Sequence, residues 1–480
     1  MIPLRRLCAL LLPLMLAPAL RAQDKPTSPW AIDRSLSVSP QRAPALALQY
    51  RLLPLNSELK EGNAVPIYLR LVHEQNDATR KYWTETPKPW NGMPVDKIPL
   101  DEARKFLQDH RRLLRQFDLG ARRRTAEWNY TLDEGNFIGI LMPDMQQMRN
   151  YAPMLILQAR VAIAEGDFAR SAHHLETGFA VSRQVGEGPF LVNSLVAIAL
   201  ASQFAGTVAD LVERPGAPNL YWALTALPRP LIDLRRAQDL EFRFVQSVFP
   251  ELDDPDRERT PEHWDGVLRR IRSEFRGLCM EGNPPKLPDW FPKDSAPEDP
   301  AAKSPDLPAA RNFVARTNGL SADKVGAMSP AQVLLLYIVG TCREDWDDFY
   351  RAAYLPYPQA RPFFEAANKR LREAHNTEGH VVSRSLFSDL NKVMSRQTAL
   401  ERALAAQRVI EALRMHAAVH DGKLPDKLDD VTEVPIPNDP GTDRPFEYSR
   451  DGDTATLVSL VPGDPVHNNG LRYRVTIRSR

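Results

Sequence analysis

Proline is the residue that most limits how this chain can fold. The 480 residues include 42 prolines but only 23 glycines, whereas an average protein holds roughly 5% proline and 7% glycine. Each proline fixes the backbone and removes an N–H donor, so helix interiors and central strands exclude it. The chain is therefore expected to consist of many short helices separated by rigid breaks.

The densest run of prolines marks a boundary between domains. Residues 281–310 contain eight of them, a density that excludes regular helix and sheet. We therefore predict a Pro-rich linker over residues 251–329. It separates a helical domain at 45–250 from a second helical domain at 330–420, and a small C-terminal module follows at 421–480.

The composition is that of a globular protein. Hydrophobic residues make up 43% of the chain and charged residues 26%, and the formal net charge is +1. This is enough apolar material to bury a core. The balanced charge gives no argument for a nucleic-acid partner, and none is expected.

The first 22 residues have the pattern of a secretory signal peptide. Arg5 and Arg6 form a basic start, Leu7–Leu20 is apolar, and Ala22 is the small residue that a signal peptidase needs. The apolar run is too short to span a ~30 Å hydrocarbon layer comfortably. We expect export through the Sec pathway to the periplasm, cell envelope or extracellular space, with residues 23–44 as a flexible leader.

Export also bears on the cysteines. Cleavage removes Cys8 and leaves Cys279 and Cys342. In an oxidising compartment these two can form one disulfide. Two separate buried thiols are the interpretation that the sequence favours.

Helical periodicity is clearest over residues 153–187. Two stripes of apolar residues recur at helical spacing, Leu155, Ala159 and Ala162 in the first and Phe168, Ala172, Leu175 and Phe179 in the second. Gly166-Asp167 separates them, and so tight a turn makes the two helices pack antiparallel. Residues 100–127 also look helical, and the charge-poor stretch 191–211 is typical of a buried helix, so no membrane span is expected after signal cleavage.

The turn Gly166-Asp167-Phe168, with the small Ser171 one turn later, resembles a tetratricopeptide-type helical hairpin. This resemblance implies a bundle of helical hairpins. The chain as a whole resembles uncharacterised exported bacterial helical proteins, which implies a location and an architecture. We therefore expect a mainly α fold, TPR-like, with a small C-terminal α+β module.

The last residues change character. A helix ends near His420, Asp421-Gly422 terminates it, Asp451-Gly452 is a hairpin signal, and residues 471–477 alternate like an edge strand. Together with Asp439-Pro440 and Phe446-Glu447-Tyr448, these features resemble the globular end of a type II secretion pseudopilin. The resemblance implies a small antiparallel sheet packed on the preceding helix.

A histidine pair lies near the end of that helix. His416 and His420 are spaced i, i+4, so both imidazoles project from one face and can share a zinc or copper ion. They flank the apolar stripe, and no carboxylate of the helix stands between them. Partly exposed helix-end residues are the interpretation that the sequence favours.

Two acidic groups are further candidates. Asp439, Asp443, Asp451 and Asp453 surround the predicted hairpin with oxygen ligands that suit calcium, although turn chemistry explains the same residues. Asp345 and Asp348, beside Trp346, form the kind of acid pair that a glycosidase cleft uses. An ordinary helix with its charged face in water has the same pattern.

Basic residues gather in one other place. The cluster consists of Arg111, Arg112, Arg115, Arg122, Arg123 and Arg124. Such a cluster can face lipopolysaccharide, anionic lipid or an acidic polymer, and it can equally be the solvated face of an amphipathic helix. His173 and His174 are expected on a solvated face.

The usual catalytic motifs are missing from the sequence. It contains no Gly-x-Ser-x-Gly elbow, no phosphate-binding loop and no His-Glu-x-x-His. We therefore expect an exported, non-catalytic protein without a cofactor, which binds another envelope protein or polymer. The alternative is an envelope hydrolase that uses Asp345 and Asp348.

Overall fold

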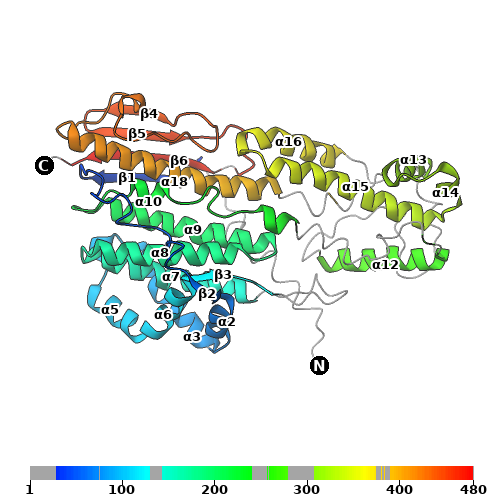
Figure 1. The fold of residues 1–480 in the computed structure, drawn as a ribbon, viewed down its shortest axis with the longest axis horizontal. Helices are drawn as coiled ribbons and strands as arrows, with labels where there is room; N and C mark the ends of the chain where they lie inside the picture. Colours follow the sequence, from blue (N-terminus) through cyan, green and yellow to red (C-terminus); the bar gives the residue numbers. More distant parts are fainter. Residues whose placement is uncertain are drawn as a thin grey trace. The chain divides into compact units, whose positions relative to one another are not determined.

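The computed structural model describes residues 29–74, 76–129, 143–239, 257, 259–278, 307–373, 380, 383, 390–466 and 468–478. The chain forms two compact units, a larger one from the described parts of 27–129, 142–238 and 392–480, and a smaller one from the described parts of 239–391. The protein is mainly helical with one small sheet module, as the sequence predicts (Figure 1).

The larger unit holds the described sheets and most of the helices. Its helices are α2 (Val65–His73), α3 (Asp77–Glu85), α4 (Pro87–Gly92), η3 (Val95–Lys97), α5 (Leu100–Asp109), α6 (Arg111–Ala121), α7 (Pro143–Ala164), α8 (Phe168–Gly186), α9 (Leu191–Val212), α10 (Tyr221–Thr225), α18 (Leu390–Val419) and η7 (Leu428–Asp430). Its strands are β1 (Trp30–Val38), β2 (Lys60–Asn63), β3 (Arg123–Thr125), β4 (Glu447–Asp451), β5 (Thr454–Ser459) and β6 (Gly470–Ile477).

Helices α7, α8 and α9 form the central layer of this unit, stacked side by side in Figure 1. The predicted turn between α7 and α8 is present, with Gly166 at φ +74°, a conformation that favours glycine. Gly178 lets α9 approach α8 closely, because a Cβ there would lie 2.3 Å from the Phe204 ring. The two helices predicted over 153–187 are present and pack against each other.

Helix α9 is the one described helix long and apolar enough to cross a membrane by length and composition. In the structure, 67% of its apolar window is buried inside the protein. Its Ala205 carbonyl accepts a hydrogen bond from Gln407 of α18 at 2.7 Å. This burial favours the core-helix interpretation.

The stretch expected to be helical, residues 100–127, contains two helices and, at its end, the strand β3. Helix α5 ends at Asp109 and α6 begins at Arg111, with His110 between them at φ −105° and ψ 13°. The His110 imidazole Nδ1 lies 2.6 Å from the Phe106 carbonyl, so the histidine caps the end of α5. The break changes the direction of the chain, and β3 follows α6.

The main sheet joins the two ends of the chain. Its strand order is β1-β6-β5-β4, with β1 parallel to β6 and the other pairs antiparallel. The predicted hairpin at Asp451-Gly452 connects β4 to β5. Two expectations are wrong here: residues 30–38 of the supposed flexible leader are a strand, and residues 471–477 form an inner strand instead of an edge strand.

The burial and pairing of β1 explain this correction. Leu36 and Val38 are buried, in register with Val475 and Ile477 of β6. On the other face, the Asp33 carboxylate accepts hydrogen bonds from Arg472 and lies 2.9 Å from Arg474. A half-buried strand of this kind is stable only beside a partner, and its partner comes at the far end of the sequence.

Helix α18 joins the sheet to the helical layer. From the sequence, the C-terminal sheet is expected to pack on the helix that precedes it, which is α18. The buried Arg402 guanidinium donates to the Ser459 carbonyl at 2.6 Å and to the Asn469 carbonyl at 2.8 Å. The buried Arg414 donates to the Ala217 carbonyl at 2.7 Å and to the Glu411 carboxylate at 2.9 Å. Charged groups of one helix thus satisfy backbone carbonyls on several segments of the unit.

The smaller unit changes the expected domain boundaries. It contains α12 (Pro261–Leu278), α13 (Leu307–Asn318), α14 (Ala322–Ala327), α15 (Pro330–Ala353) and α16 (Tyr357–Glu373). The linker at 251–329 is therefore wrong over α12, α13 and α14, and residues 279–306 lie outside the described residues. The predicted linker is too long because two of its prolines, Pro261 and Pro308, stand in the first turns of helices, where proline is tolerated. The expected domain at 330–420 is divided, since α18 belongs to the larger unit.

Candidate functional site

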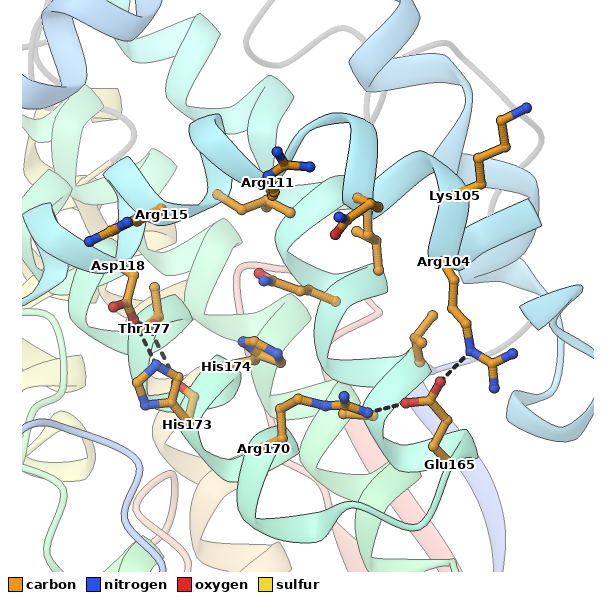
Figure 2. A pocket seen from close by; sticks show the side chains of 16 residues that line it. Arg104, Lys105, Arg111, Arg115, Asp118, Glu165, Arg170, His173, His174 and Thr177 are labelled. Atoms are coloured by element: carbon orange, nitrogen blue, oxygen red, sulfur yellow. Dashed lines mark hydrogen bonds and ion pairs between the residues drawn. The ribbon is translucent and has the colours of Figure 1, made fainter. Parts of the chain in front are cut away.

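A concentration of positively charged side chains surrounds a cavity in the larger unit. Helices α5 and α6 pack over α7 and α8, and the cavity between them has a volume of about 860 Å³. Its charged and titratable lining residues are Arg104, Lys105, Arg111, Arg115, Asp118, Glu165, Arg170, His173 and His174. Five cationic side chains and two carboxylates are therefore among the residues that line the cavity (Figure 2).

Helix periodicity places these residues. In α6, Leu113, Leu114 and Phe117 are buried, so Arg111 and Arg115, spaced i, i+4, share the opposite side and line the cavity. The apolar side of the helix packs into the unit and its arginines stay at the surface. The break at His110 allows α5 to add a second wall.

Both carboxylates in the cavity are already occupied. Glu165 accepts a hydrogen bond from Arg104 at 2.5 Å and also pairs with Arg170. Asp118 lies 2.8 Å from the His173 Nε2 and 2.6 Å from Arg122. Burial opposes the ionisation of Asp118, but the His173 hydrogen bond and the Arg122 charge outweigh it and hold its pKa below the ordinary value.

Three cations are left without a carboxylate. In the part of the chain that the structure describes, Lys105, Arg111 and Arg115 form no ion pair. Figure 2 shows Arg111 and Arg115 along the α6 wall, while Lys105 extends outward from α5 at the rim. An anion that enters the cavity can therefore bind these three cations without breaking an ion pair among the described residues.

His174 lies across the cavity from the α6 arginines, and it is half-buried instead of solvated as expected. Burial, together with the charges of His173 and Arg170, lowers its pKa to about 4. The imidazole is therefore neutral near pH 7. It can offer a hydrogen bond to a ligand without adding charge.

The structure divides the basic cluster that the sequence predicts. Arg111 and Arg115 line the cavity, whereas the exposed Arg112 does not. Arg122 binds Asp118 and Glu176. The remaining two are used locally, since Arg123 donates to the Glu61 carbonyl and Arg124 to the Glu61 carboxylate. Sequence reasoning missed the contributions of Arg104, Lys105 and Arg170, which come from other helices.

The hydrolase candidates Asp345 and Asp348 do not form an open acid pair. Both lie on α15, and Arg370 donates to each of them, at 3.1 Å and 2.6 Å. Asp345 is buried and its second oxygen lies 2.6 Å from His380 Nδ1. Both carboxylates are therefore used in an internal network of ion pairs and hydrogen bonds with Arg370 and His380.

The calcium candidates do not converge either. Asp439 is buried and accepts hydrogen bonds from Ser459 Oγ at 2.5 Å and from the Gly441 N–H at 2.8 Å. Asp443 adopts a positive φ of 57° in the same turn. Asp451 and Asp453 are exposed at the hairpin. Core hydrogen bonding accounts for Asp439, and the other three lie in turns or directly beside them.

The proposed disulfide is not decided, since Cys279 lies outside the described residues. Cys342 is buried in α15, and burial raises the pKa of its thiol to about 12. A thiol in that state is a poor nucleophile.

A lone carboxyl group occupies a smaller cavity of about 220 Å³ between α10, α18 and the loop at 435–440. Burial raises the pKa of Glu401 there to about 7, although its carboxylate accepts the Leu231 N–H. No second carboxylate, histidine, serine or cysteine is among the residues that line this cavity. It therefore lacks the paired groups that acid–base or nucleophilic catalysis needs.

Comparisons of the chain with models of known protein families, with curated proteins and with solved structures find no match.

Proposed function

We propose that this protein binds an acidic segment of another macromolecule in the cavity between α5–α6 and α7–α8, without transforming it chemically. The observation that carries the proposal is the presence of three cations without an ion-pair partner, Lys105, Arg111 and Arg115, around a cavity whose carboxylates are both paired. Clefts lined by one sign of charge concentrate ligands of the opposite sign.

The size and lining of the cavity favour a chain segment over a single small ion. A volume of about 860 Å³ lies in the range of sites for drug-sized ligands, about 300–1,000 Å³. Leu107, Leu114 and Val161 add apolar surface, which suits a ligand with both charged groups and carbon chain. Arginine also binds carboxylate and phosphate through two parallel hydrogen bonds.

A binding role fits the chemistry of the lining better than catalysis. Asp118 and Glu165 form ion pairs with cations, and burial lowers the pKa of His174, so that its imidazole is neutral. No serine or cysteine lines the cavity. Such a site can hold an anion, but it offers no activated nucleophile for it.

We further propose that the protein acts outside the cytoplasm, with residues 1–22 removed as a Sec signal. The α7–α8 hairpin would serve as a tetratricopeptide-like unit, and the sheet carried on α18 as a pseudopilin-like module. N-terminal sequencing of the protein recovered from cell fractions tests the first point. A start at Gln23 in the envelope or medium supports it, and an intact Met1 in the cytoplasm contradicts it.

The binding proposal is tested with defined probes. Fluorescently labelled polyglutamate, inorganic polyphosphate and neutral polyasparagine are titrated into the mature chain, and polarisation is recorded. Acidic probes are expected to bind, and the neutral probe is not. Equal binding of all three, or of none, contradicts the proposal.

A lysine-protection measurement locates the bound probe. Lys105 lies at the rim of the cavity, while Lys97 in η3 is also exposed but outside it. Bound polyglutamate should slow acylation of Lys105 by an amine-reactive reagent and leave Lys97 unchanged, as read by mass spectrometry. Protection of Lys97 with no protection of Lys105 would place the ligand elsewhere.

A further inference from the structure

A second site lies at the other side of the same unit, where α18 ends. Within the described part of the chain, His416, His420 and Glu433 form the one group of histidine, cysteine and acidic side chains whose ligand atoms all lie within 4.8 Å of one another. His416 lies in the last turn of α18, and His420 directly follows the end of that helix. Glu433 comes from the loop between η7 and β4, thirteen positions after His420.

Two of the three separations between the ligand atoms match those in a zinc site. Nδ1 of His416 lies 3.3 Å from Glu433 Oε1, and Nδ1 of His420 lies 3.4 Å from the same oxygen. A zinc ion with ligands at 2.0–2.1 Å in a tetrahedron has edges of about 3.3–3.4 Å between ligand atoms. The usual N–H···O hydrogen bond is shorter, about 2.9–3.0 Å.

The surroundings hold two of the three groups in place. His416 is buried, with 8% of its side chain exposed, and Glu433 has 17% exposed. The Thr432 N–H donates to the second carboxylate oxygen of Glu433 at 3.1 Å, which orients the carboxylate. The two imidazole rings lie 3.9 Å apart between centroids, at an interplanar angle of 19°.

His420 is the group that must adjust. Its Nδ1 also lies 2.9 Å from the His416 carbonyl, so in the metal-free state that nitrogen carries a proton and donates it there. With 47% of its side chain exposed, the ring has room to turn and present a lone pair. To bind a metal through Nδ1, the neutral ring must carry its proton on Nε2 instead, because only the unprotonated nitrogen has a lone pair to donate.

We propose that His416, His420 and Glu433 bind one Zn²⁺ ion, with water in the fourth position. Imidazole nitrogen and carboxylate oxygen form a donor set that suits zinc. The fourth position is left to water because three protein ligands are present and His420 lies at the surface. The ion ties the end of α18 to the loop that leads into β4.

The test measures zinc binding by the mature chain. Isothermal titration with zinc chloride should give one ion per chain, and the melting temperature should rise with zinc concentration, because a ligand of the native state stabilises it. Cobalt(II) in place of zinc should give the intense visible bands of a tetrahedral site. Absence of binding at micromolar zinc overturns the proposal.

Variants of the exposed and half-buried ligands locate the ion and avoid the buried His416. His420→Ala and Glu433→Gln should each weaken zinc binding at least about tenfold, on the scale seen for changes around metal sites, and remove the cobalt bands. The matched controls His73→Ala and Glu447→Gln change exposed residues elsewhere and should leave both unchanged. Circular dichroism without metal verifies that each variant is folded. Wild-type zinc affinity in both ligand variants would overturn the assignment.

Discussion

The acidic-segment proposal makes a quantitative prediction for two arginines. Changing Arg111 and Arg115 together to glutamine removes two unpaired positive charges from the cavity wall and keeps hydrogen-bonding side chains of similar length. Both residues are exposed and neither has an ion pair among the described residues. The folded protein should therefore change in stability by no more than about 0.5 kcal/mol.

The loss in affinity follows from the exposure of the two charges. An exposed ion pair contributes about 0.2–1 kcal/mol, so removing two should cost about 0.4–2 kcal/mol of binding free energy. Since 1.4 kcal/mol corresponds to a factor of ten, the Kd for polyglutamate should rise about 2- to 30-fold. The Debye length falls from about 10 Å at 0.1 M salt to about 3 Å at 1 M, so the difference should shrink as salt is added.

The assay is a polarisation titration of labelled polyglutamate at several salt concentrations. The matched control is Arg112→Gln, which removes the same charge from the same helix at a residue that does not line the cavity. Its Kd should stay within about twofold of the wild-type value. If the double variant binds as the wild type does, or if Arg112→Gln is equally damaging, the cavity is not the binding site.

Three further predictions concern the architecture around the sites. Arg402→Met should lower the free energy of unfolding by about 3–5 kcal/mol in a urea titration, because it leaves the buried Asp439 without its cation. The double variant Arg402→Met, Asp439→Asn should recover part of that loss. A strictly additive loss would show that the two side chains do not interact. The pKa of His174, lowered to about 4 against an ordinary 6.5, means that the unfolded chain binds the proton more readily, so stability should fall as pH drops from about 6.5 to 4. His174→Gln should reduce that fall by about 2–3 kcal/mol, and an unchanged pH dependence would refute this role. Gly178→Ala places a methyl group 2.3 Å from the Phe204 ring and should cost about 1–3 kcal/mol, whereas an unchanged melting temperature would show that α8 and α9 adapt freely.

Several elements could be predicted because their signals are local. The hairpin of α7 and α8 follows from two apolar stripes around Gly166-Asp167, and the β4–β5 turn from Asp451-Gly452. The proximity of His416 and His420 could also be predicted from their i, i+4 spacing, since it depends only on local helix geometry. Each of these features involves residues close in sequence, which local periodicity and turn chemistry describe well.

The break between α5 and α6 is a local feature that the sequence analysis missed. Nothing but His110 interrupts the helical pattern, and no glycine or proline marks the position. The break matters for the candidate site, because α5 and α6 form separate walls of the cavity. Tertiary packing here overrode a continuous helical propensity.

What the sequence by itself determined is therefore the mainly helical class, the turns, and the positions of charged helix faces. The tertiary structure alone decided that β1 pairs with β6, that Arg170 and Arg104 meet at Glu165, and that Glu433 completes a group with His416 and His420. The physical reason is the range of the interactions. Helix periodicity acts over a few residues, whereas strand pairing and the convergence of side chains depend on which distant segments pack together.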